Sequence, residues 1–159
     1  MLSKCSKLMW GLAAFTLLAG LLPVNYLVVT TAQTHCYLRA PEFSLQWRHS
    51  VEHQLWQEHY RHDGKRLFLY QTWLQTFGAG TPSQGTSLVN VPPGYIGYEQ
   101  HIELAELDWV VSHRMEGTIN SANWHFPIYQ TLPDYSTVNI KPTQSPLILF
   151  LLGSACNDG

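Results

Sequence analysis

Charged side chains are scarce in this sequence, and positive charge is not in excess. Lysine and arginine together number 9, and aspartate and glutamate number 11, so the formal net charge is -2. Proteins that bind nucleic acid carry clustered positive charge, so the composition gives no electrostatic reason to expect nucleic acid as a partner. Hydrophobic residues make up 45% of the chain, which argues against compositional disorder and predicts a domain with a buried core.

Cysteine is also scarce. The three cysteines form no CxxC pair and no cluster of the kind that binds a metal, so we expect neither a metal nor a cofactor. Cys36 and Cys156 lie near the two ends of the predicted folded domain. They can form a disulfide if that domain lies in an oxidising compartment, although the sequence does not fix their geometry.

One long hydrophobic run lies at the N-terminus. Lys4 and Lys7 precede an uncharged apolar stretch over residues 8–22, and apolar residues resume after Pro23 and Asn25. A positive start followed by a short apolar core is typical of a signal peptide. The whole run, residues 8–29, is also long enough to span a bilayer as a retained anchor.

The retained anchor is favoured because the only small-x-small cleavage site, residues 30–32, is a poor one. In both cases the two lysines stay in the cytoplasm and the remainder is exported. We therefore expect residues 1–25 to form a hydrophobic helix, the single N-terminal anchor or signal segment, in the inner (cytoplasmic) membrane. Residues 26–159 would then form an extracytoplasmic domain on the periplasmic side.

The pattern after the anchor is that of short strands joined by turns rich in glycine and proline. Residues 42–47 alternate polar and apolar, and Asp63-Gly64 between two apolar runs is a strong hairpin signal. Residues 78–97 predict a long loop, and the final apolar run, residues 146–152, predicts a buried strand because it is too short to cross a membrane. The expected fold is mainly β, a small antiparallel β-sandwich or barrel-like domain.

The stretch HSVEH, residues 49–53, matches H-x-x-E-H, in which two histidines bind zinc and the glutamate is a general base. That chemistry requires a helix and a third ligand. The alternating pattern runs straight into the motif, a hairpin follows, and no recognisable second motif supplies the ligand. We therefore predict neither a metal site nor catalytic residues here. An extended segment would place His49 on the face of Trp47 and turn Glu52 to the other face.

Two interpretations of these polar residues stay open. In the structural one, His49 is buried and hydrogen-bonded by Glu58 or by backbone carbonyls, which fixes the strand register. In the functional one, four polar residues converge near the glycine-rich loop, with its Gly78 and Gly80, and bind a small polar ligand or a partner. These four residues are His49, Ser50, Glu52 and Glu58.

The chain resembles the domain of unknown function family eighteen-fifty. The resemblance covers residues 49–82 and rests on HSVE, on Glu58, on the D-G turn and on GAG-x-P, which begins at Gly78. His53 lies outside the family pattern. The resemblance implies a small membrane-anchored protein with an extracytoplasmic domain, associated with TAXI-type TRAP transporters. Those transporters take up small organic anions by means of a periplasmic binding protein, and the resemblance implies no activity for the family itself.

Our leading hypothesis is a non-enzymatic accessory to a TRAP-type (TAXI) uptake transporter. It would contact the membrane subunit or the periplasmic binding protein through the HSVE region and the loop of residues 78–97. The alternatives are an envelope module that binds a small ligand or a metal through His49, Glu52 and Glu58, and an envelope hydrolase that depends on His49 and Glu52.

Overall fold

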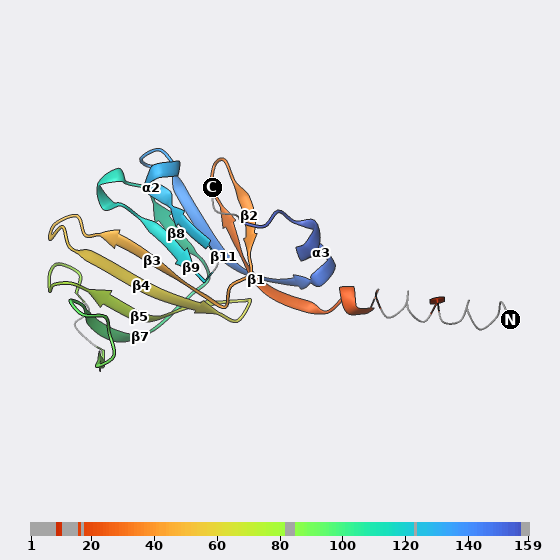
Figure 1. Ribbon diagram of the computed structural model, residues 1–159, viewed down its shortest axis with the longest axis horizontal. Coiled ribbons are helices and arrows are strands. Elements are labelled where there is room, and N and C mark those ends of the chain that lie inside the picture. The colour runs from red at the N-terminus through yellow and green to blue at the C-terminus, as the bar shows by residue number, and fades with distance from the viewer. Residues whose placement is uncertain (1–8, 11–15, 17, 82–84, 123, 157–159) are drawn as a thin grey trace.

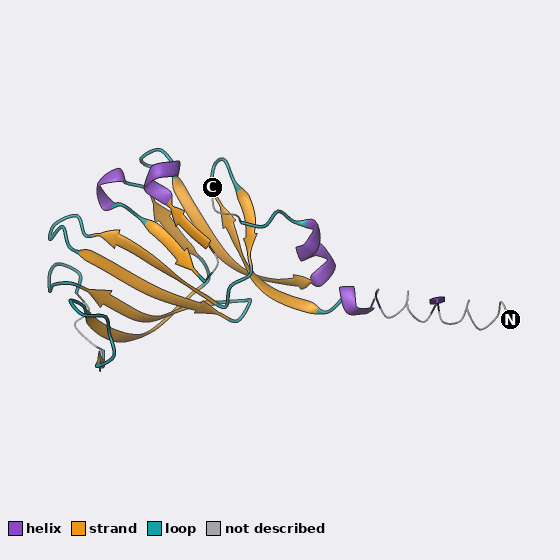
Figure 2. Cartoon of the chain, in the orientation of Figure 1, coloured by secondary structure: helices purple, strands orange, loops and turns teal. Residues whose placement is uncertain are grey.

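The protein is mainly β in the computed structural model, which describes residues 9, 10, 16, 18–81, 85–122 and 124–156 (Figures 1 and 2). The strands are β1 (Pro23–Thr30), β2 (His35–Leu38), β3 (Glu42–Arg48), β4 (Leu55–His62), β5 (Leu67–Leu74), β6 (Ser87–Leu88), β7 (Ile96–Leu104), β8 (Leu107–Val110), β9 (Thr118–Ser121), β10 (Trp124–Pro127) and β11 (Thr137–Pro146). Short helices are η1 (His113–Met115), α2 (Ile128–Thr131) and α3 (Leu147–Leu152).

Two antiparallel sheets make up the domain. The smaller sheet has four strands in the order β2-β1-β11-β8, and the larger has seven in the order β10-β9-β3-β4-β5-β7-β6. They face each other as in a sandwich, and over the described residues they do not join into a closed barrel. The mainly β, antiparallel prediction is therefore confirmed, and the barrel alternative is not.

The core lies between the two sheets and follows the period-two pattern of the sequence. In β3 the apolar set Phe43, Leu45 and Trp47 is buried, as the alternation predicted. Leu27 and Ile140 of the smaller sheet are almost fully buried against this face. Burial of such side chains is the main favourable contribution to folding.

The predicted hairpin at Asp63-Gly64 is confirmed and joins β4 to β5. The Asp63 carboxylate accepts hydrogen bonds from the backbone N–H groups of Lys65 and Arg66, each at 2.8 Å. Gly64 has φ +91°, a conformation that glycine adopts at little cost. The turn therefore has a local cause that is visible in the sequence.

The final apolar run is a helix and not the buried strand that its sequence predicted. Strand β11 pairs with β1 as far as Pro146, opposite Pro23, the first residue of β1. Residues 147–152 then form α3, in which no residue is buried. Leucine and phenylalanine accept helical geometry without difficulty, so the run turned helical where the pairing of β11 with β1 ends.

The last part of the N-terminal apolar run also differs from its prediction. Residues 23–29 do not extend a hydrophobic helix, because they belong to β1, which pairs with β11 and β2. Pro23, Asn25 and the β-branched valines disfavour helix there. The expected anchor, residues 1–25, falls largely outside the described residues. In the part of the chain that is described, no helix has the length and apolar character needed to cross a membrane.

A disulfide joins Cys36 in β2 to Cys156 in the C-terminal tail, the two cysteines paired in the sequence analysis, with their Cα atoms 5.0 Å apart. The tail runs beside β2, because Tyr37 and Ala155 form a parallel bridge. The bond thus fastens the end of the chain, beyond α3, to the edge of the smaller sheet.

Candidate functional site

HSVEH forms the connection between β3 and β4, and the expectation of an extended strand there is wrong. The His49 N–H donates to the Gln54 carbonyl at 2.8 Å, and the His53 N–H donates to the His49 carbonyl at 3.0 Å. His53 closes the turn with φ +56°, and Ser50 is exposed on it. The helix that an H-x-x-E-H zinc site requires is therefore not formed. His53, the fifth residue of the motif, contributes only its backbone N–H and carbonyl to these contacts.

The turn brings Glu52 back to His49, whereas the extended interpretation placed them on opposite faces. The Glu52 Oε2 atom meets His49 Nδ1 in an ion pair, and each side chain is 17% exposed. The His49 ring stacks on Trp56 of β4, with the ring centroids 4.8 Å apart and the planes 24° from parallel. His49 is thus partnered by Glu52 and Trp56, and not by Glu58 as the structural interpretation suggested.

Glu52 also holds the GAG segment that follows β5. Its Oε1 accepts a hydrogen bond from the Ala79 N–H at 2.9 Å. A Cβ at Gly78 would overlap the Glu52 carboxyl group, and Gly80 has φ +81° with Trp56 as its neighbour. The Ala79 N–H, with a smaller effect of His49, lowers the pKa of Glu52, so this carboxylate stays ionised.

The two halves of the family pattern, HSVE and GAG, therefore meet in space. Four of the six residues singled out from the sequence cluster here: His49, Glu52, Gly78 and Gly80. Trp56, which the sequence analysis did not single out, lies between them, and its indole Nε1 is buried with no hydrogen-bond partner among the described residues. The antiparallel hairpin is the reason for this meeting, because it places the start of β4 beside the end of β5.

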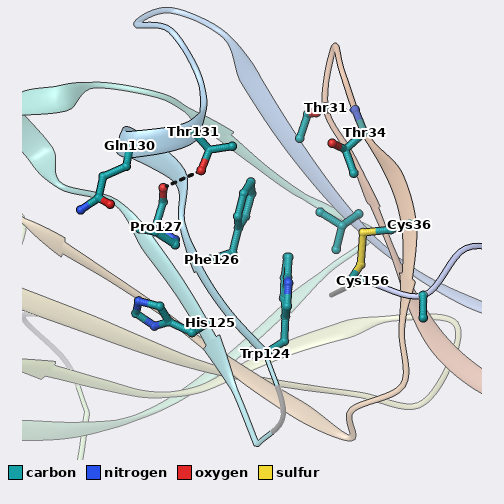
Figure 3. A pocket seen from close by; sticks show the side chains of 12 residues that line it. Thr31, Thr34, Cys36, Trp124, His125, Phe126, Pro127, Gln130, Thr131 and Cys156 are labelled. Atoms are coloured by element: carbon teal, nitrogen blue, oxygen red, sulfur yellow. Dashed lines mark hydrogen bonds between the residues drawn. A yellow bond between two sulfur atoms is a disulfide. The ribbon is translucent and has the colours of Figure 1, made fainter. Parts of the chain in front are cut away.

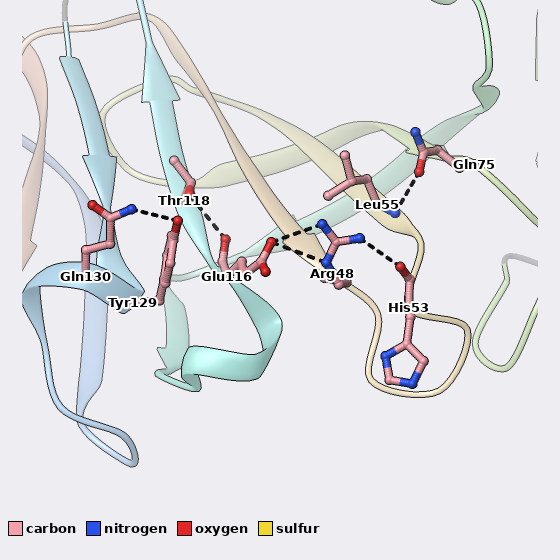
Figure 4. Close-up of polar contacts among 8 residues, drawn as sticks. All are labelled: Arg48, His53, Leu55, Gln75, Glu116, Thr118, Tyr129 and Gln130. Carbon is pink, nitrogen blue, oxygen red and sulfur yellow. Dashed lines mark hydrogen bonds and ion pairs between the residues drawn. The ribbon is translucent and has the colours of Figure 1, made fainter.

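A second set of contacts braces the turn from outside (Figure 4). Arg48 donates to the His53 carbonyl at 2.9 Å and, through Nε and Nη2, to one carboxylate oxygen of Glu116 at 3.2 and 3.1 Å. The Leu55 N–H donates to the Gln75 side chain at 3.0 Å. Arg48 is the last residue of β3 and Gln75 directly follows β5, so both lie next to the two motifs in sequence. Glu116 is distant in sequence, and no pattern indicated that it would contact the turn.

Glu58 belongs to a different environment. It lies on the inner face of β4 between Trp56 and Tyr60, opposite Leu45 and Thr72. The Tyr60 hydroxyl donates to its carboxylate at 2.5 Å. Burial raises the pKa of Glu58, and the hydrogen bond from Tyr60 opposes that rise only partly. Glu58 is thus a core-facing acid, and the expected convergence with His49 and Glu52 does not include it.

Glu58→Gln is expected to raise the free energy of unfolding at pH 7. A carboxyl group whose pKa is raised by folding favours the folded state while it is protonated, below its unfolded value of 4.5, and loses that advantage as the pH rises. Glutamine stays neutral and can still accept the Tyr60 hydrogen bond. Urea unfolding at several pH values measures the difference, which should shrink to nothing below about pH 4.

Glu99→Gln is the control for this comparison, because it removes one negative charge from a half-exposed side chain. A Glu58→Gln protein that is less stable than the wild type at pH 7, or whose advantage grows in acid, would contradict the argument.

Exposed apolar side chains surround the HSVE and GAG cluster. Val51, Phe77 and Val89 are 67%, 62% and 95% exposed, and their loops leave the same end of the seven-stranded sheet. We call this end, formed by residues 49–54, 75–81 and 89–95, the motif end; it lies at the left in Figure 1. The motif end therefore carries three exposed apolar side chains, two of them on the loops that Glu52 holds together.

A cavity of about 610 Å³ lies elsewhere, between the edge strands β2 and β10 (Figure 3). Trp124 and Phe126 stack with ring centroids 5.1 Å apart and line it together with the disulfide, Thr31 and Thr131. Its described lining includes no lysine and no arginine. The cavity does not include His49, Glu52 or Glu58, the residues to which the sequence assigned ligand binding.

Metal binding has no cluster to support it within the described ranges. Over those ranges no group of three or more histidine, cysteine, aspartate or glutamate side chains is arranged to hold a metal ion. His49 and Glu52 instead contact each other, and His53 lies exposed on the turn.

Comparison with known proteins gives a family match. The profile of a family described as Domain of unknown function (DUF1850) matches residues 43–128, more than half of the chain. No curated protein and no solved structure matches at a significant level. The matched segment runs from β3 to the start of α2, so it contains HSVE, GAG and Glu116.

Proposed function

Because the chain belongs to the DUF1850 family, we propose that it is a non-enzymatic accessory protein of a TAXI-type TRAP uptake transporter. Its N-terminal segment attaches it to the inner membrane, and its β-domain works outside the cytoplasm. The motif end is the surface that contacts the transport system.

The observation that carries this proposal is the construction of the motif end. Glu52 ties the HSVE turn to the GAG segment, and Arg48 ties the same turn to Glu116. Val51 and Phe77 project from these braced loops into solvent. Loops that are ordered before binding lose less entropy when a partner docks, so such a surface favours binding to a protein.

The position of the motif end favours the periplasmic binding protein as the contacted component. The motif end and the start of β1 lie on opposite sides of the β-domain (Figure 1). A membrane attachment that precedes β1 would direct the motif end away from the bilayer. A soluble binding protein can approach it there more readily than a membrane subunit can.

The lining of the cavity between β2 and β10 favours an accessory role for this domain over a role as the receptor that binds the solute. The solutes of these transporters are expected to be organic anions, and proteins usually bind carboxylates through arginine or lysine. The described lining of the cavity contains neither. Recognition of the solute would then belong to the binding protein, and this domain would act on that protein.

The double variant Val51→Asp/Phe77→Asp is expected to lower anion uptake to the level of a strain that lacks the protein. Two carboxylates in the centre of an apolar contact must be desolvated when the partner docks, which opposes binding. Uptake of a radiolabelled anion and co-purification of the binding protein with the full-length chain measure the effect.

Tyr135→Asp is the matched control, because Tyr135 is 89% exposed and lies outside the motif end. Its φ of +68° suits aspartate at least as well as tyrosine. The proposal is wrong if a deletion strain takes up the anion normally, or if the control and the double variant behave alike.

A further inference from the structure

An apolar surface at the end opposite the motif end has no role in the proposed contact. Seven of the large hydrophobic side chains that are exposed lie on two short segments, residues 18–22 and helix α3. They are Leu18, Leu21, Leu22, Ile148, Leu149, Leu151 and Leu152. We call this surface the apolar patch.

The two segments of the apolar patch lie side by side. The Leu147 N–H donates to the Leu22 carbonyl at 2.9 Å. An added Cβ on Gly20 would lie 3.7 Å from the Ile148 Cβ. Figure 1 shows α3 beside the start of β1, at the end of the domain where the N-terminal chain enters.

Helix α3 is fixed to the domain from both sides. Phe150 turns inward and packs on Tyr26 with ring centroids 5.1 Å apart. Beyond the helix, the Tyr37 N–H donates to the Ser154 carbonyl at 2.8 Å, and the Cys36–Cys156 disulfide closes the tail. A six-residue helix is not stable alone in water, so these contacts hold it in place with its leucines exposed.

The two chain segments that carry the apolar patch contain no charged residue of their own. Residues 8–34 and 142–156 contain no aspartate, glutamate, lysine or arginine. Protein–protein interfaces usually combine an aromatic and apolar core with a polar, charged rim. Two aliphatic segments that carry no charge of their own match the hydrocarbon edge of a bilayer better.

We propose that the apolar patch lies in the outer surface of the membrane that holds the N-terminal segment, with α3 as a second, interfacial contact. The inference rests on the membrane attachment in the proposed function. Residues 18–22 end the apolar run that begins at Leu8, so lipid already surrounds one half of the patch. Six helical residues span about 9 Å, so α3 lies along the interface and does not cross it.

The second contact fixes the orientation of the domain. A domain held by one flexible attachment can rotate over the membrane, whereas two contacts on the same domain define one face. That face lies opposite the motif end (Figure 1). The apolar patch thus presents the motif end to the space outside the membrane.

Photocrosslinking in vesicles of phosphatidylethanolamine and phosphatidylglycerol tests this inference. Benzoylphenylalanine replaces Leu152, which is 79% exposed, or Val89 at the motif end, which is 95% exposed, in the full-length chain. Irradiation is expected to add a phospholipid to the chain labelled at position 152, with at least about ten times the yield at position 89, because only lipid-facing groups meet acyl chains. Non-reducing electrophoresis checks that each labelled chain keeps its disulfide.

Equal lipid yields at the two positions, or a protein adduct at position 152 in place of lipid, would overturn the interfacial contact. Carbonate washing separates this failure from that of the proposed function. A chain that stays with the vesicles but gains no lipid at position 152 refutes the inference alone. A chain released by washing refutes the membrane attachment as well, whereas loss of partner binding at the motif end leaves the lipid adduct unchanged.

Discussion

Gly78→Ala is expected to weaken partner binding by roughly tenfold, because the contact loops would have to be ordered again on docking. The new Cβ would occupy the position of the Glu52 carboxyl group. Glu52 would swing away and lose both the Ala79 N–H and His49. The GAG segment and Phe77 before it would then no longer be held against the HSVE turn.

The fold should survive this substitution. Gly78 does not have the positive φ found at Gly64, Gly80, Gly85 and Gly94, so alanine fits its backbone, and the obstructing group is the end of a flexible side chain. Co-purification of the binding protein measures the loss. Thermal unfolding should show a domain that is still cooperative.

Gly94→Ala is the control that distinguishes two causes of weaker binding: the lost contacts of Glu52, and backbone strain in the loops of the motif end. Gly94 has φ +86° and nothing lies within 4 Å of its added Cβ, so alanine there strains the backbone without touching Glu52. The explanation fails if Gly94→Ala abolishes partner binding while Gly78→Ala retains it.

Removal of the disulfide is expected to have the largest effect on stability. The double variant Cys36→Ala/Cys156→Ala should lower the free energy of unfolding by about 2–4 kcal/mol. The bond joins residues 120 positions apart, and closing a long loop restricts the unfolded chain strongly. Urea unfolding of the full-length protein in detergent measures the difference.

Reduction supplies an independent check of the same prediction. Dithiothreitol should destabilise the wild type to the level of the double variant and leave the double variant unchanged. Cys5→Ser is the control, because it removes the third thiol and keeps the Cys36–Cys156 bond. Equal unfolding midpoints for the wild type and the double variant would refute the stabilising role of the disulfide.

The strands were the most predictable part of the molecule. Alternation over residues 42–47 depends only on the neighbours of each residue, and it reappears as the buried face of β3. The Asp63-Gly64 turn likewise needs only its own backbone N–H groups and one carboxylate. The run PLILFLL failed as a prediction because its hydrophobicity is compatible with strand and helix. The choice depended on where the pairing with β1 ends, at Pro23 and Pro146.

The candidate site was predictable in its members and not in its geometry. His49, Glu52 and Gly78 belong to two short motifs that are readable in the sequence. If the alternation of the strand had continued through the motif, His49 and Glu52 would lie on opposite faces. The turn brings them into contact instead. Glu58, which belongs to the same family pattern, is instead paired with Tyr60 on the inner face.

The sequence by itself determined the β class, the β4–β5 hairpin, the family and the pair of cysteines available for a bond. Each of these depends on local patterning or on residue identity. Only the tertiary structure decided that Glu52 holds Ala79, that Arg48 reaches Glu116, and that α3 lies beside residues 18–22. Those contacts join distant segments, and their geometry follows from strand register, bulges and strand ends that no single segment encodes.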